Sequence, residues 1–160
     1  MKLKSGHVTG ILCAALLIFF AGCRKPDQPA RSRTELITAA PWKFSQVGID
    51  QNNDGIADIP LPSTFVSTCS TDNLYTFKAD STGILDEGPI ICSSINPRVS
   101  PFTWYFLNNQ TEINISANLL TIFTGPAKIV ELSETRFSLA KDVGIHGYPS
   151  PLPLVVTLVH

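Results

Sequence analysis

The 160-residue sequence contains little charge and no excess of positive charge. Asp, Glu, Lys and Arg make up 16% of the chain, and only Lys2 and Lys4 are charged among the first 22 residues. The other 138 residues hold ten basic residues against 13 acidic ones, a net charge of −3. This balance gives nucleic acid no electrostatic reason to bind. We therefore expect no nucleic-acid partner.

Histidine is scarce, and no catalytic motif contains one. The three histidines are His7, His146 and His160, and none forms a recognisable triad with a Ser or Cys. The chain has no Gly-x-Ser-x-Gly sequence and no His and Cys cluster with zinc-site spacing. We therefore expect a protein that is not an enzyme, with a barrel enzyme as the weaker alternative.

Long helices and membrane-spanning runs are also missing. All 12 prolines follow residue 25, which leaves no room for a long helix. The apolar run at residues 11–20 is uncharged but has ten residues, whereas a membrane-spanning helix needs about 20. Because the basic Lys2 and Lys4 precede it, the run is typical of a signal-peptide core.

The apolar run leads into Phe20-Ala21-Gly22-Cys23. This resembles the lipobox of bacterial lipoproteins, although Phe20 stands where the family usually has Leu. The resemblance implies that residues 1–22 are a signal peptide and that Cys23 carries the lipid, palmitate among its acyl chains. A plain secretory signal is the alternative.

Residues 23–33 have the composition of a tether between this anchor and a domain. The segment contains Pro26 and Pro29 and no apolar run, which predicts an extended chain. It also contains four basic residues, Arg24, Lys25, Arg31 and Arg33. They fit either a contact with anionic lipid headgroups or a solvated linker.

The remaining chain begins with a helix signal and continues with strand signals. Ser32 and Glu35 have capping-box spacing, and Pro41 limits the helix to one or two turns. Eight segments then have strand character: residues 42–49, 74–79, 82–87, 102–107, 111–116, 126–133, 136–142 and 153–159. Short connections favour antiparallel neighbours. We predict an all-β fold, an eight-stranded antiparallel up-and-down barrel with a short N-terminal helix; a sandwich is the alternative.

Cys69 and Cys92 are the cysteines that remain after the leader and Cys23, and an exported chain predicts a disulfide between them. If the hairpin turns at Asp80-Ser81, opposed residue numbers sum to 161, as do those of the two cysteines. This register places Phe77 opposite Ile84. A bulge at Gly83 would shift it by one residue, and two buried free thiols are the alternative to the disulfide.

Several segments together resemble the lipocalin-like domain of Gram-negative envelope lipoproteins. They are Trp42-Lys43 after the helix, Cys69 with residues 72–77, Asp80-Ser81-Thr82-Gly83, Cys92, Thr103-Trp104 and residues 127–137. The resemblance covers about residues 34–142 and implies a barrel domain over residues 34–160, closed at one end by the helix. It also implies a place in the cell envelope, at the outer membrane, and binding of a small hydrophobic ligand.

Two lipocalin features are absent. Lipocalins have Gly two residues before the first-strand Trp and an Arg from the last strand over that Trp. Here Ala40 takes the first position and no Arg follows Arg136. A barrel filled with side chains is therefore the alternative to a hollow one.

Aromatic residues repeat with strand alternation at candidate interior positions. They are Tyr75, Phe77, Phe102, Trp104 and Phe106. Their side chains would line the barrel interior, where they either stack on an apolar ligand or fill the core.

Residues 50–58 carry a partial calcium-loop pattern. Oxygen side chains occupy positions one, three and five, a glycine occupies position six, and a carbonyl and a carboxylate follow; the residues are Asp50, Asn52, Asp54, Gly55, Ile56 and Asp58. Leu61 stands where the bidentate Glu should be. Calcium is therefore a candidate cofactor, and a metal-free Asn/Asp turn is the alternative.

These patterns predict a lipid-anchored envelope lipoprotein whose partners are the membrane and a small hydrophobic ligand. The alternative is a non-catalytic interaction or structural module with a solid-packed barrel, braced by calcium in one version.

Overall fold

The computed structural model describes residues 30–62, 64–92, 97–119, 123–144 and 150–160. Within it, residues 31–160 form one compact unit. The predicted signal peptide, Cys23, most of the predicted tether and His146 lie outside the described residues. In chain order the elements are α2 (Arg33–Ile37), β1 (Trp42–Ile49), β2 (Ile59–Pro60), the 3-10 turn η2 (Thr68–Ser70), β3 (Leu74–Phe77), β4 (Thr82–Asp86), β5 (Val99–Leu107), β6 (Glu112–Leu119), β7 (Phe123–Leu132), β8 (Arg136–Val143) and β9 (Leu152–Val159).

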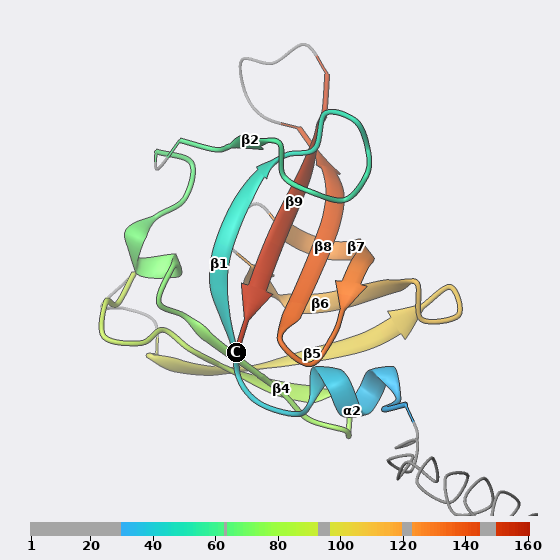
Figure 1. Ribbon diagram of the computed structural model, residues 1–160. Coiled ribbons are helices and arrows are strands. Elements are labelled where there is room, and N and C mark those ends of the chain that lie inside the picture. The colour runs from blue at the N-terminus through green and yellow to red at the C-terminus, as the bar shows by residue number, and fades with distance from the viewer. Residues whose placement is uncertain (1–29, 63, 93–96, 120–122, 145–149) are drawn as a thin grey trace, which may run out of the picture. The chain divides into compact units, whose positions relative to one another are not determined.

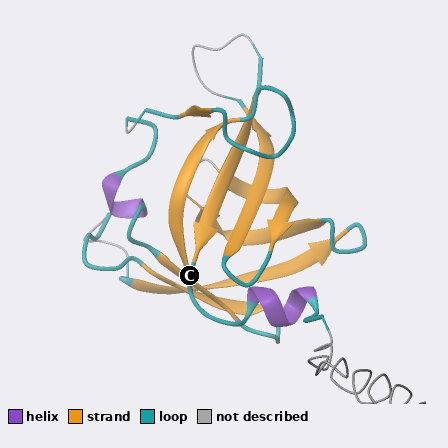
Figure 2. Ribbon diagram, viewed as in Figure 1, coloured by secondary structure: helices purple, strands orange, loops and turns teal. Residues whose placement is uncertain are grey.

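Eight of these strands form a closed antiparallel barrel (Figures 1 and 2). From β3 to β9 each strand pairs with the next along the chain, and β9 pairs back onto β1 from Lys43–Val159 to Ile49–Leu154. The prediction of an eight-stranded up-and-down barrel is confirmed, and the sandwich is excluded. The two-residue β2 was not expected and lies outside the ring, paired with the end of β1.

The short helix α2 begins and ends where its local sequence predicts. Glu35 N donates to Ser32 Oγ at 3.2 Å, and Ser32 N donates to Glu35 Oε2 at 2.7 Å, which completes the capping box. The Ser32 hydroxyl also donates to Glu35 Oε2, and the hydrogen bonds that this carboxylate accepts from the Ser32 side chain and backbone lower the pKa of Glu35. At the other end of the helix, Ile37 is fully buried in the core and its carbonyl accepts from Trp42 Nε1 at 2.8 Å. The helix therefore lies at the barrel end where β1 begins (Figure 1).

The β3–β4 hairpin has a different register from the predicted one. Phe77 lies opposite Gly83 and Thr76 lies opposite Ile84, because opposed numbers sum to 160. Lys78 N donates to Thr82 O, and Ser81 has a positive φ of 67°, which makes a three-residue loop with a bulge instead of a two-residue turn. The predicted pairing of Phe77 with Ile84 is therefore wrong by one residue.

The disulfide between Cys69 and Cys92 is confirmed, with a Cα–Cα distance of 5.1 Å. The hairpin register from which we argued for this pairing does not explain it, since neither cysteine lies in the β3–β4 ladder. Cys69 lies in η2, and Cys92 follows β4. The bond closes a loop that the chain-entropy model values at about 3.4 kcal/mol.

The observed register explains why residue 83 is a glycine. A Cβ atom placed there would lie 2.2 Å from Cζ and 2.4 Å from Cε2 of Phe102. We expect Gly83→Ala to lower the free energy of unfolding by about 1–3 kcal/mol, because the ring or the strand must move. Urea denaturation measures this change. Gly144→Ala is the matched control, since no atom of the described residues lies within 4 Å of its Cβ position. Equal effects of the two substitutions would contradict the packing described.

Candidate functional site

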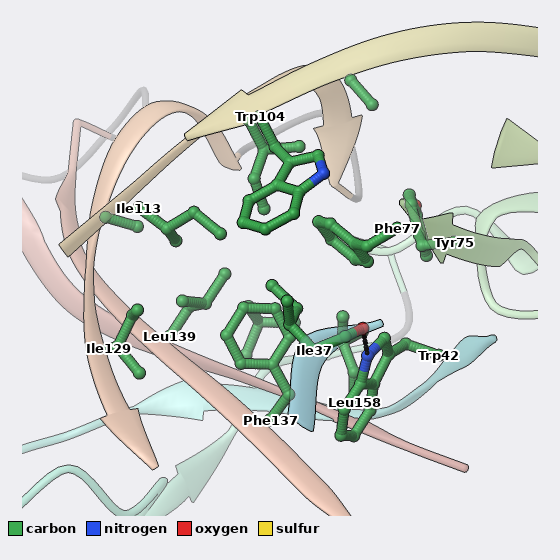
Figure 3. Packing of buried hydrophobic residues seen from close by; sticks show 14 of the residues in the cluster. Ile37, Trp42, Tyr75, Phe77, Trp104, Ile113, Ile129, Phe137, Leu139 and Leu158 are labelled. Carbon is green, nitrogen blue, oxygen red and sulfur yellow. Dashed lines mark hydrogen bonds between the residues drawn. The ribbon is translucent and has the colours of Figure 1, made fainter. Parts of the chain in front are cut away.

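The five aromatic residues predicted to line the barrel interior all belong to the core cluster or pack against it. Figure 3 shows three of them, Tyr75, Phe77 and Trp104, in this cluster. Tyr75, Phe77, Phe102 and Trp104 are at most 4% exposed, and Phe106 is half-buried. The ring of Phe77 lies edge-on to three others, with centroids 5.1 Å from Phe102, 5.6 Å from Trp104 and 6.0 Å from Phe137. These rings contact one another, in the manner of a filled core.

Hydrogen bonds fix the largest of these rings in place. Trp104 Nε1 donates to the carbonyls of Lys78 and Thr82, at 3.1 and 3.0 Å. The two acceptors flank the β3–β4 turn. Because a buried indole N–H is costly to leave unpaired, a ligand that displaced Trp104 would have to replace these bonds. Binding of a ligand at the centre of the barrel is therefore unfavourable.

His160 covers Trp42 at the closed end of the barrel. The two rings are stacked, with centroids 3.7 Å apart, and Nδ1 of His160 lies 3.1 Å from the carbonyl oxygen of Pro41. On its other side Trp42 contacts Phe137 at 5.6 Å. Sequence reasoning missed His160, although the absence of the lipocalin Arg was a signal to look for a substitute over Trp42.

Two of the four basic tether residues, Arg31 and Arg33, lie among the described residues. Arg31 forms an exposed ion pair with Glu134 at 3.7 Å, and the buried Nε of Arg33 has no hydrogen-bond partner among the described residues. Neither contact tests a membrane role. No helix in the described part of the chain is long and apolar enough to cross a bilayer.

The predicted calcium loop is held by its own backbone. Asp50 is 4% exposed and accepts from the N–H groups of Asp54 and Gly55, at 3.2 and 2.8 Å. Asn52 Oδ1 accepts from Asp54 N, Asp54 Oδ1 from Ile56 N, and Asp58 Oδ2 from Gln51 N. Within the described ranges, no three His, Cys, Asp or Glu side chains gather as a metal site. Calcium binding here stays a prediction.

This loop packs against the outside of the barrel and borders a charged pocket. Asp50 N donates to Pro153 O, and a Cβ at Gly55 would overlap Val130 Cγ1. The pocket has a volume of about 260 Å³, and charged residues of both signs line it, namely Asp50, Asp54, Lys128, Lys141 and Asp142.

A second pocket, of about 280 Å³, lies beside β1 in the seam between β1 and β3. β1 pairs with β3 only at Trp42–Tyr75 and Lys43–Leu74, and on that side it next pairs with β2, at Gly48–Pro60. The strand edge between these points is covered by the chain that links β1 to β3. The lining residues, which define the seam pocket, are Phe44, Gln46, Val47, Pro60, Leu61, Val66, Thr68 and Thr71.

The floor of the seam pocket belongs to the hydrophobic core. Val47 and Val66 are buried members of the core cluster, and Phe44 and Leu61 pack against it. On the outer side, Thr68 belongs to η2, which the Cys69–Cys92 disulfide ties to the segment after β4. The pocket thus has an apolar floor and a covalently braced wall.

Sequence reasoning missed all eight residues of the seam pocket as a site. One signal was available: from Asp50 to Asn73 the connection between β1 and β3 has 24 residues, and connections of that length are usually functional or disordered. Leu61 and Val66 in this connection have no strand alternation that would place them in the barrel.

Substitution of Asp50 distinguishes the two interpretations of this loop, a metal-free turn and a calcium site. We expect Asp50→Ala to lower the free energy of unfolding by about 1–3 kcal/mol in EDTA, since the N–H of Gly55 loses its acceptor and that of Asp54 keeps only Asn52 Oδ1. Thermal and urea unfolding measure this, with the exposed Asn52→Ala as the comparison. No loss in EDTA but a clear loss in calcium would assign the role of Asp50 to a bound ion.

No protein-family model and no curated protein sequence matches the chain.

Proposed function

We propose that this protein is a lipid-anchored lipoprotein of the bacterial cell envelope, at the outer membrane, and that its lipocalin-like barrel binds a small hydrophobic molecule without catalysis. The observation that supports a binding role is the seam pocket. Its floor consists of residues of the hydrophobic core, and the Cys69–Cys92 disulfide holds its outer wall in place. Val47 and Val66 are already packed in the folded protein. A ligand on this floor gains apolar contact with the half-buried Phe44 and Leu61 beside them, without a costly ordering of the site.

The anchoring part of the proposal rests on the N-terminal sequence and on the disulfide. Lys2 and Lys4, the apolar run and Cys23 have the order of a lipoprotein leader. The Cys69–Cys92 bond fits an oxidising compartment such as the periplasm. An acylated Cys23 would hold the barrel close to the membrane, since ten extended residues lead from Cys23 to Arg33 and span at most about 35 Å.

The ligand is placed in the seam pocket and not among the central aromatic residues. Phe77 and Trp104 are packed on each other and on their neighbours, and opening a space between them would cost those contacts. The same packing favours a second candidate function, a structural or interaction module with a solid barrel. The two candidates differ in whether the seam pocket takes up a molecule.

Native mass spectrometry of the protein from its own host distinguishes them. We expect an apolar adduct on the wild type and its loss in Val66→Trp, because the indole would fill the pocket. Val99→Trp is the matched control, since Val99 is half-exposed on β5 and does not line the pocket. Thr68→Phe on the pocket rim is a second blocking variant if Val66→Trp fails to fold. A wild type without adduct under mild conditions would favour the structural module.

Cys23→Ala tests the lipid anchor. We expect this variant to leave the membrane fraction and to lack the mass of the acyl chains, because Cys23 is the residue on which the lipid would be attached. Membrane fractionation and intact-mass analysis measure both changes. Cys13→Ala, a change within residues 1–22, should behave as the wild type does. Continued membrane retention of Cys23→Ala would rule out this anchor.

A further inference from the structure

We infer that the seam pocket selects an uncharged molecule, about two fused rings in size, with one hydrogen-bonding group such as a hydroxyl. This inference rests on the proposed binding function and names the chemical class of its ligand. It is drawn from the volume of the pocket, the absence of charge in its lining, and polar side chains at its outer side.

The volume limits the size of the ligand. An engineered protein cavity of about 150 Å³ holds one benzene molecule. The seam pocket has about 280 Å³, nearly twice that volume, and it lies just below the usual range of about 300–1,000 Å³ for drug-sized ligands. A bicyclic compound or a short branched chain fits, whereas a long-chain lipid would extend well outside.

The lining limits the charge of the ligand. None of the eight lining residues is charged, and five of them, Phe44, Val47, Pro60, Leu61 and Val66, are apolar. An ionised headgroup in this space would lose water without gaining a partner, which is strongly unfavourable. The pocket therefore discriminates against fatty-acid carboxylates.

Neutral polar groups lie at the outer side of the pocket. The side chains of Gln46 and Thr68 are exposed and form no hydrogen bond with other described residues. The hydroxyl of Thr71 donates to Thr68 O at 2.8 Å and keeps its own acceptor capacity. The Gln46 amide and the Thr68 hydroxyl can both donate and accept, and the Thr71 hydroxyl can accept. These groups suit a ligand hydroxyl and provide no counter-charge for an ion.

The position of Thr68 and Thr71 depends on the disulfide. η2 ends at Ser70, and Thr71 N donates to Thr68 O at 3.2 Å, so one turn holds both hydroxyl-bearing residues. Cys69 lies between them and is bonded to Cys92. The polar side of the pocket is therefore set before a ligand arrives.

Three naphthalene derivatives of similar size test the inference: 2-naphthol, 2-naphthoate and 2-naphthylmethylammonium. Each is titrated by calorimetry into the full-length protein in lipid nanodiscs, with empty nanodiscs as the blank for partitioning. We expect 2-naphthol to bind at least about tenfold more tightly than either ion, because binding of an ion includes the free-energy cost of desolvating its charge. Val66→Trp should abolish the binding and Val99→Trp should retain it.

The polar contact is tested by Thr68→Val, which removes a hydroxyl and keeps the shape. We expect about a three- to tenfold weaker affinity for 2-naphthol, from the loss of one hydrogen bond. Thr135→Val, an exposed threonine in the β7–β8 turn, is the matched control and should not change the affinity.

The outcomes separate this inference from the function on which it rests. If either ion binds as tightly as 2-naphthol, and Val66→Trp abolishes that binding, the neutral class is wrong while the binding function stands. Binding of 2-naphthol that persists in Val66→Trp and in Thr68→Phe would overturn the assignment to the seam pocket. If no probe binds above the empty nanodiscs, the inference and the proposed binding function both fail.

Discussion

The pairing of β1 with β9 is the constraint on which the rest of this structure depends. It joins the first and last strands of the ring from Lys43–Val159 to Ile49–Leu154, and it removes two sheet edges that would otherwise be open to other chains. Because the barrel is closed, every strand has one face that points into its interior. Trp42 and Leu158, which are near the two ends of the domain in sequence, belong to one buried cluster for this reason.

Closure by β9 leaves β1 with little pairing on its other side. β1 meets β3 over two residue pairs only, and a shift in register between Phe44 and Gln46 marks the place where its pairing with β9 is irregular. The seam pocket lies beside this stretch, where Val47 of the core is near the surface of the barrel wall. The same topology thus produces a packed centre and a pocket at one side.

The long β1–β3 connection contains the candidate calcium loop and five of the eight residues that line the seam pocket. Its first part, around Asp50, packs over β7, and its own backbone N–H groups donate hydrogen bonds to the Asp50 carboxylate. Its later part covers the seam with Leu61 and Val66. The disulfide fixes this later part to the segment after β4. A barrel with a filled interior can in this way carry a binding site in a connection, because the strands supply a rigid floor and the connection supplies specific side chains.

The sequence by itself determined the local elements and the architecture that follows from them. Strand alternation, turn residues and short connections predicted all eight barrel strands. Ser32 and Glu35 set the helix cap, because these are interactions between residues close in the chain. The disulfide was predicted from the cysteine count and from the expectation of an exported chain. The register of the β3–β4 hairpin, the stacking of His160 on Trp42 and the seam pocket were decided only by tertiary structure. They depend on a three-residue turn at Ser81, on strand closure and on where a 24-residue connection packs. Periodicity does not encode these contacts, since each joins residues whose distance in space is set by the whole ring.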